Sequence, residues 1–177
     1  GAGGLSVVED DPRRPGLRLM RHTLSVLVRN EFGVLSRVVG MFSGRGYNID
    51  CLNVAPTLDP KISHITLVTE GEDEVVEQIS KQLHKLIDVI KVTDHTVGTF
   101  VDREMAMLKV APPPEARAEV LRIAEIFRGK IVDVGPKSFV IEMTGAREKI
   151  EAIARLLEPL GLREMTRTGP LAMLRGA

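Results

Sequence analysis

Asn30, Gly33 and Asn48 flank a predicted helix, and their types suit contact with a small ligand. Backbone N–H groups at a helix start lack partners inside the helix, so they can bind an anion such as a carboxylate. Glycine has no Cβ and therefore lets a ligand approach the main chain. The asparagine amides offer donors and acceptors to the charged groups of an amino acid. We expect the fold to bring both ends of the helix to one amino acid, and we find no groups suited to breaking a bond.

The same residues also have common structural roles. Asn30 can act as a helix N-cap, and Asn48 can occupy a left-handed turn after Gly46 and Tyr47. The residue types alone favour these structural roles slightly, so both interpretations stay open at this point.

The remaining reactive side chains lack the spacing of a catalytic or metal site. The histidines are interpreted as structural because none pairs at i, i+4 as zinc ligands on a helix do; they are His22, His64, His84 and His95. The single Cys51 cannot form an internal disulfide and is interpreted as a small buried residue. Gly40, Gly44 and Gly46 form a pattern at the end of the predicted helix instead of at the start of one, so helix packing and a C-cap explain them better than phosphate binding. We therefore predict no catalytic residue and no metal ligand.

Composition predicts a globular protein without a charge bias. The chain has 177 residues, 44% of them hydrophobic, and its 24 basic residues equal its 24 acidic ones. Without a basic excess, nucleic acid is disfavoured as the main partner. The apolar runs are short and interrupted by charge, so none approaches the roughly 20 residues that span a bilayer. We expect a cytoplasmic chain, or one in the plastid stroma if a transit peptide has been removed, with residues 1–20 as a flexible lead-in.

Hydrophobic periodicity predicts the order strand, helix, strand, strand, helix, strand in the first half. Alternation over 24–28 indicates a strand, and apolar residues at i, i+3, i+4 and i+7 over 35–42 indicate a helix with one buried face. The further predicted elements are strands over 47–55, 62–68 and 89–92, and a helix carrying Val76, Ile79 and Leu83, with Gly98 at the end.

The second half repeats this order with different residues. We predict strands over 105–110, 131–134 and 139–143, helices over 120–127 and 150–157, Gly129 as the stop of the first of these helices, and a last strand between 162 and 174. The chain is therefore predicted to be α+β, with two ferredoxin-like βαββαβ domains in tandem, over 21–98 and 99–177.

The predicted sheets also carry apolar side chains on the face that the helices leave uncovered. On the first strand Leu27 points opposite to Val26, and on the third strand Val68 points opposite to Leu67. A symmetric homodimer would cover this face. Coverage of one half by the other within a single chain is nearly as good an explanation.

Specific sequence segments are spread over nearly everything after Met20. They are 24–28, 30–39, Phe42-Ser43, 45–49, 54–57, 78–86, Arg103-Glu104 and 125–134. Together these segments resemble the regulatory (small) subunit of acetolactate synthase, an ACT-domain family. The resemblance implies that the first domain is an ACT domain, which dimerises and binds a branched-chain amino acid, commonly valine, between two such domains.

The resemblance also implies which residues would contact the effector around an apolar pocket. These are Asn30, Gly33, Val34, Leu35, Asn48 and Ile49. The sequence departs from the family pattern at Phe32, where many relatives carry Pro or a small residue, and at Cys51, which replaces a usual small hydroxyl residue or Ala. Phe32 could narrow the pocket or change which branched-chain amino acid binds best.

The implied function is that of a non-catalytic regulatory subunit in valine, leucine and isoleucine biosynthesis. Such a subunit would activate the catalytic large subunit of acetolactate synthase and confer feedback inhibition by the branched-chain amino acids. Thiamine diphosphate, Mg²⁺ and FAD would belong to that partner and not to this chain. The alternative is a free-standing amino-acid-sensing transcription regulator, which lacks a helix-turn-helix pattern or basic stripe to support it here. A small enzyme on a ferredoxin-like fold is a third class.

Overall fold

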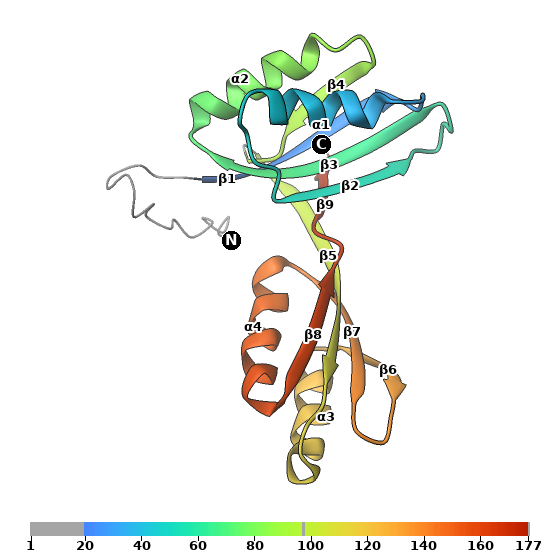
Figure 1. Ribbon diagram of the computed structural model, residues 1–177, viewed down its shortest axis with the longest axis vertical. Helices are drawn as coiled ribbons and strands as arrows, with labels where there is room; N and C mark the ends of the chain where they lie inside the picture. Colours follow the sequence, from blue (N-terminus) through green and yellow to red (C-terminus); the bar gives the residue numbers. More distant parts are fainter. Residues whose placement is uncertain (1–19, 97, 177) are drawn as a thin grey trace. The chain divides into compact units, whose positions relative to one another are not determined.

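The computed structural model describes residues 20–96 and 98–176, which form two compact units. The first unit extends through Val101 and also includes Ala172–Ala177, and the second comprises Asp102–Leu171. Figure 1 shows the helices and strands of both. The residues from Ala172 onward group with the first unit, although the domain prediction of 99–177 placed them with the second. Apart from Met20, the predicted lead-in lies outside the described residues.

The first unit is a four-stranded antiparallel sheet with its helices on one face. Its elements are β1 (Met20–Arg29), α1 (Val34–Gly44), β2 (Cys51–Pro56), β3 (Ile62–Gly71), α2 (Asp73–His84) and β4 (Val89–Asp94). The strand order is β2-β3-β1-β4, and both helices cover the same side of the sheet (Figure 1). This is the βαββαβ order that the periodicity predicts.

The core of the first unit lies between the sheet and these helices. Leu24 and Val26 on β1 lie opposite Leu67 and Ile65 on β3, and all of them are fully buried. Burying an aliphatic side chain of this size stabilises the fold by about 1.5–3 kcal/mol. The helices add to the same cluster Val34, Val38, Met41, Phe42, Val76, Ile79 and Leu83. This packing fixes which side of each helix faces the sheet.

The second strand begins later than the periodicity predicts. Residues 47–50 are irregular, and β2 begins only at Cys51. The chain leaves α1 through Gly46, whose φ is 71°, and the N–H of Tyr47 donates to the carbonyl of Phe42 at 3.0 Å. A left-handed glycine with a bond back into the last turn is a common helix end. Tyr47 and Ile49 pack against the core, so their apolar character reflects this packing and not a strand ladder.

The second unit repeats the plan. Its elements are β5 (Phe100–Val110), α3 (Arg117–Ile126), β6 (Lys130–Val134), β7 (Phe139–Gly145), α4 (Arg147–Leu157) and β8 (Leu162–Arg167), with 3-10 turns at Pro114–Ala116 and Glu158–Leu160. The strand order is β6-β7-β5-β8, and an additional strand, β9 (Leu171–Leu174), pairs with β5. The predicted fold class, two ferredoxin-like α+β units in tandem, is confirmed.

The single last strand predicted between 162 and 174 is in fact two strands. β8 ends at Arg167 and β9 begins at Leu171. Between them, Gly169 has a φ of 74° and Pro170 has no backbone N–H, so neither residue continues a regular ladder.

Gly129 follows α3 as predicted and closes its last turn with a backbone hydrogen bond, and its lack of a Cβ also serves packing. The left-handed residue at this helix end is Arg128, with a φ of 57°, and Gly129 donates its N–H to the carbonyl of Ala124 at 2.7 Å. A Cβ at position 129 would lie 2.9 Å from Cγ2 of Ile141. Glycine is therefore required here by close packing against β7.

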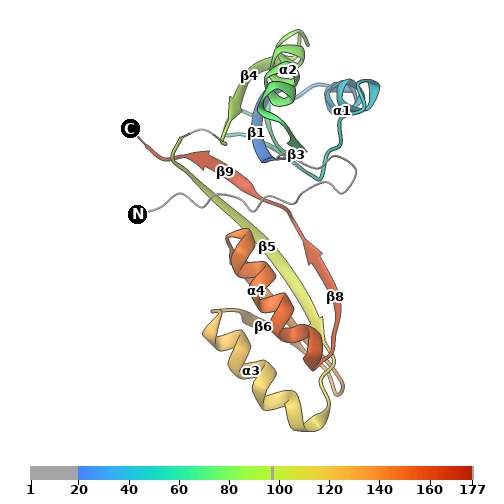
Figure 2. The ribbon, with the colours of Figure 1, turned by 90° about the vertical axis from the view of Figure 1, so that its left-hand side faces the viewer.

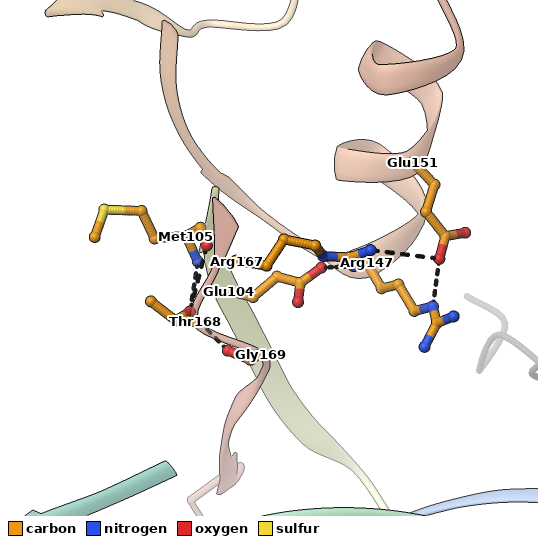
Figure 3. Close-up of polar contacts among 7 residues, drawn as sticks. All are labelled: Glu104, Met105, Arg147, Glu151, Arg167, Thr168 and Gly169. Carbon is orange, nitrogen blue, oxygen red and sulfur yellow. Dashed lines mark hydrogen bonds and ion pairs between the residues drawn. The ribbon is translucent and has the colours of Figure 1, made fainter. Parts of the chain in front are cut away.

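A network of charged side chains joins β5, β8 and α4 in the second unit (Figure 3). Glu104 on β5 is buried and forms an ion pair with Arg167 of β8. Arg167 also lies 3.9 Å from Glu151 of α4, which pairs with Arg147 one turn earlier. A buried carboxylate needs such partners, because an unpaired buried charge is strongly destabilising.

Hydrogen bonds beside this network join β5 to the residue that follows β8. The N–H of Thr168 donates to the carbonyl of Met105 at 3.0 Å, and the N–H of Met105 donates to the hydroxyl of Thr168 at 3.1 Å (Figure 3). The charged network and these bonds thus hold together the two ends of the second unit, next to Asp102 and Leu171.

The helix-free face of the first sheet is partly covered by the chain itself. Thr66 and Val68 point to this face and are buried. Ala172 is buried as well, and the first-unit part of β9 runs on the side of the sheet away from α1 and α2 (Figure 2). The homodimer stays a prediction.

Candidate functional site

Helix α1 begins at a glycine in a left-handed conformation. Gly33 has a φ of 79° and a ψ of −2°, and it caps α1 without a side-chain hydrogen bond. The N–H of Arg37 is bonded to the Gly33 carbonyl at 3.1 Å, so the amides of Leu35 and Ser36, which precede it, have no acceptor inside the helix. Amides in this position are the groups that binding of a carboxylate requires.

The backbone at position 33 requires glycine. Residues that have a Cβ rarely adopt a positive φ, because the Cβ then crowds the following carbonyl. A Cβ built on Gly33 would also lie 3.2 Å from Nη1 of Arg37. The guanidinium can move, so the backbone conformation is the stronger of these requirements.

Asn30 holds the loop before α1 and does not cap the helix, which corrects the N-cap interpretation. Its N–H donates to the carbonyl of Lys61 at 2.7 Å, and its Nδ2 donates to the carbonyl of Pro60 at 2.9 Å. Both acceptors lie in the turn between β2 and β3. Asn30 therefore fixes the loop that ends at Gly33.

A buried carboxylate fixes the same loop from the other side. Asp88, between α2 and β4, is 5% exposed, and its Oδ2 accepts hydrogen bonds from Nε and Nη2 of Arg37 at 2.8 and 2.7 Å. Its backbone carbonyl accepts the N–H of Arg29 at 2.9 Å. The sequence-based interpretation missed Arg37 and Asp88. In the sequence, only the position of Arg37 one turn after Gly33 could have indicated that Arg37 helps to fix this loop.

Asn48 is exposed beyond the other end of α1. Its Nδ2 donates to Oδ1 of Asp50 at 2.5 Å, and its backbone carbonyl accepts the hydroxyl of Thr69 at 2.6 Å. Among the described residues, Arg128 is the only non-glycine residue with a positive φ, so the left-handed role suggested for Asn48 is wrong. Gly46 takes the left-handed position instead.

The two polar ends of α1 do not meet within one chain, which corrects the expectation that the fold brings them to one ligand. Gly33 precedes the helix and Asn48 follows it, and α1 has 11 residues. At a rise of 1.5 Å per residue, such a helix is roughly 16 Å long. Figure 1 shows the loop before α1 and the segment after it at opposite ends of the helix.

The apolar residues of the predicted site differ in exposure. Val34 is buried in the core, Leu35 is 41% exposed, and Ile49 is partly buried. Phe32 is fully exposed and lines no pocket within a single chain. Leu35 and Ile49 are therefore the members that can contact a ligand's side chain.

Most of the other reactive side chains have structural contacts. His22 Nδ1 lies 3.0 Å from Oγ1 of Thr96, and His84 Nδ1 lies 2.8 Å from the carbonyl of Ser80. Cys51 is partly buried at the start of β2. Within residues 20–96 and 98–176, no three His, Cys, Asp or Glu side chains are grouped so that they could hold a metal ion. In the same part of the chain, every helix is too short or too polar to cross a membrane.

Comparison with known proteins covers both units. Residues 24–91 match the family model described as the AHAS small subunit-like ACT domain, and residues 103–176 match the model described as the small subunit of acetolactate synthase. The acetolactate synthase small subunit of Aquifex aeolicus is 48% identical over 99% of this chain and 92% of its own length. The acetolactate synthase isozyme 3 small subunit of Escherichia coli is 46% identical over 89% of this chain and 97% of its own length.

A solved structure agrees with these sequence matches. The acetolactate synthase small subunit from Thermotoga maritima superposes with a TM-score of 0.81 at 41% identity, over 89% of this chain and 98% of that one. With both halves matched in order, the chain belongs to the family of acetolactate synthase small subunits, and its first unit contains an ACT domain.

Proposed function

We propose that this chain is a non-catalytic regulatory subunit that activates the catalytic large subunit of acetolactate synthase and confers feedback inhibition by branched-chain amino acids, with valine as the main effector. Membership in the small-subunit family implies a large-subunit partner. In this proposal thiamine diphosphate, Mg²⁺ and FAD are held by that partner and none by this chain. A location in the cytoplasm, or in the plastid stroma, stays a prediction.

The observation that carries the effector proposal is the separation of the exposed polar groups at the two ends of α1. A ligand that touches both ends needs two copies of the chain, with the start of α1 in one copy beside the end of α1 in the other. A twofold axis produces this arrangement and repeats the site. We therefore propose a homodimer with the effector at the interface between ACT domains.

Each part of an amino acid has a partner in this arrangement. The carboxylate binds the amides of Leu35 and Ser36 beside Gly33 in one copy. Asn48 of the other copy keeps its Oδ1 for the ammonium, since its Nδ2 is bonded to Asp50. The branched side chain contacts Leu35 and Ile49.

Inhibition requires that the effector distinguish two states of the complex. A ligand shifts an equilibrium only by its difference in affinity between the states. By reciprocity, a large subunit that prefers the effector-free state weakens effector binding by the same factor. The loop before α1, held by Asn30 and Asp88, is the part of the site that links the effector to β3 and β4.

An activity assay of the large subunit tests this function. We expect the full chain to raise the activity of the large subunit, and valine to reduce the stimulated activity at lower concentration than leucine or isoleucine. Stimulation without any response to the three amino acids would refute the effector role. Turnover by the isolated chain would refute the non-catalytic role.

A further inference from the structure

The helix-free face of the first sheet is hollowed by a cavity that the proposed effector site does not use. This cavity has a volume of about 490 Å³, and its walls include the segment from Ala172 to Leu174. All its lining residues belong to the first unit. None of them is a residue of the proposed effector site, because that site lies at the ends of α1 on the other side of the sheet.

The strand register places polar groups around an apolar centre on the floor of this cavity. Leu27 on β1 lies opposite Lys91 on β4 and opposite His64 on β3. In the next row on the same face, Ser25 lies opposite Thr93. Because neighbouring strands are about 4.8 Å apart, Lys91 and His64 flank Leu27 at a spacing that one small molecule can span.

The lining carries an uncompensated positive charge. Lys91 is exposed and lines the cavity, whereas no Asp or Glu is among the lining residues. Within the described chain, the side chains of Lys91, His64 and Thr93 make no hydrogen bond or ion pair, so their polar groups are free to contact a ligand.

His95, another polar residue of the lining, has an unsatisfied atom. His95 lines the cavity and is 3% exposed, and its Nε2 lies 2.6 Å from Oγ of Ser25. Its Nδ1 is buried and has no partner among the described residues. Buried polar atoms nearly always have a hydrogen-bond partner. This nitrogen has none, and its residue lines a cavity large enough for a ligand or water.

We propose that this cavity binds a small monocarboxylate with a short apolar chain, separately from the amino-acid effector. The carboxylate pairs with the ammonium of Lys91 and is within reach of the hydroxyl of Thr93 and the ring of His64. The apolar chain contacts Leu27 and Met173. The volume of the cavity lies in the usual range for small-molecule sites.

The absence of acidic lining residues sets the selectivity of this site. The ammonium group of an amino acid would find no carboxylate partner there, and a desolvated charge without a partner is costly. A carboxylic acid that lacks only the ammonium should therefore bind the cavity better than the amino acid. Isovalerate and valine form this pair, because they differ by one amino group.

Amide chemical shifts of the full chain, titrated with each compound, test the proposal. We expect isovalerate to shift the amides of Leu27, His64 and Thr93 in a saturable way, and valine to leave these amides unchanged. The proposal does not depend on effector binding at α1. It is overturned if isovalerate shifts no amide, or if it shifts only those at the ends of α1.

Substitution of the charged group gives a second test. Lys91→Met keeps the length of the side chain and removes the ammonium, so the affinity for isovalerate should fall by about tenfold, which corresponds to about 1.4 kcal/mol. Thr93→Val, which keeps the shape of the residue, should weaken binding by a smaller factor. Lys85→Met is the matched control, because Lys85 is exposed outside the cavity. Equal affinity of Lys91→Met and Lys85→Met for isovalerate would overturn the proposal.

Discussion

At the residue scale, the structure separates groups that can contact an effector from groups that shape the loop around it. The amides after Gly33 have no acceptor inside the helix and Asn48 is exposed, whereas Asn30 and Arg37 bond to other loops. The need for glycine at position 33 was predictable, because it depends on the local backbone. The role of Asn30 was not, since its acceptor on Pro60 is 30 residues away in sequence.

Gly33→Asp should abolish feedback inhibition and leave stimulation of the large subunit largely intact. The new carboxylate occupies the place of the effector's carboxylate and repels it, while the strain at a φ of 79° stays local to the loop. The measurement is the activity of the large subunit with this variant, titrated with valine. Gly176→Asp, which adds the same charge where a Cβ meets no atom within 4 Å, is the control. Unchanged valine inhibition of Gly33→Asp would contradict this placement.

Asn48→Ala should weaken valine binding by about 1–3 kcal/mol, because the ligand's ammonium loses a hydrogen-bond acceptor. Isothermal titration calorimetry measures the affinity. Thr144→Ala removes an exposed polar side chain from β7 of the second unit, outside the proposed site, and should leave the affinity unchanged. If Asn48→Ala binds valine like the unmodified chain, Asn48 only positions the segment after α1, through its bond with Asp50.

At the scale of elements, hydrophobic period predicted the order of strands and helices but not all their ends. A spacing of i, i+3, i+4 and i+7 identifies a buried helical face wherever the helix packs on a sheet, as α1 does. Tyr47 and Ile49 also pack on the core, so they carried the hydrophobic signal of a strand without forming one. The break at Gly169 and Pro170 was visible in the sequence, and proper weight on these residues would have separated β8 from β9.

The buried ion pair of the second unit should be essential to that unit's stability. Arg167→Met leaves Glu104 buried without its partner and should lower the free energy of unfolding by about 2–4 kcal/mol. The double variant Glu104→Met/Arg167→Met should recover most of this loss, because it removes both charges. Urea unfolding followed by far-UV circular dichroism measures these changes.

The control for this pair is an exposed one in the same sheet. Lys109 and Glu164 are 3.9 Å apart, and their side chains are 50% and 76% exposed. Lys109→Met should change stability by no more than about 0.5 kcal/mol. Tyr47, the single tyrosine, reports on the first unit and should unfold at an unchanged urea concentration in Arg167→Met. A destabilisation no larger than that of Lys109→Met would show that the buried pair contributes little.

At the scale of the whole molecule, equal numbers of acidic and basic residues do not mean that the charges are evenly distributed. The chain has 24 basic and 24 acidic residues, yet the cavity on the helix-free face is lined by a lysine and histidines without a carboxylate. This grouping could not be predicted from the sequence, because it depends on the register of β1 with both β3 and β4. The strand residues of this lining, between Ser25 and His95, come together only after the sheet has formed, and Ala172–Leu174 complete the cavity.

The same face should make the first unit less stable in mild acid. Desolvation lowers the pKa of His64 below its ordinary value of 6.5. It also lowers the pKa of His95, where the charge of His64 lowers it further and Asp94 partly opposes the shift. Between the lowered values and about 6.5 the unfolded chain binds more protons than the folded one, so stability falls as the pH falls through this window. Above pH 6.5, the ordinary pKa of histidine, these two histidines do not lower the stability of the first unit.

Urea unfolding of the first unit, followed by Tyr47 fluorescence, should therefore show a lower midpoint at pH 5 than at pH 7.5. The double variant His64→Gln/His95→Gln should lose much of this difference, because glutamine does not titrate and its amide can still bond to Ser25. His84→Gln, on the exposed side of α2, is the control and should keep the full difference. If the double variant loses as much stability in acid as the His84→Gln control, groups other than these histidines cause the acid sensitivity of the first unit.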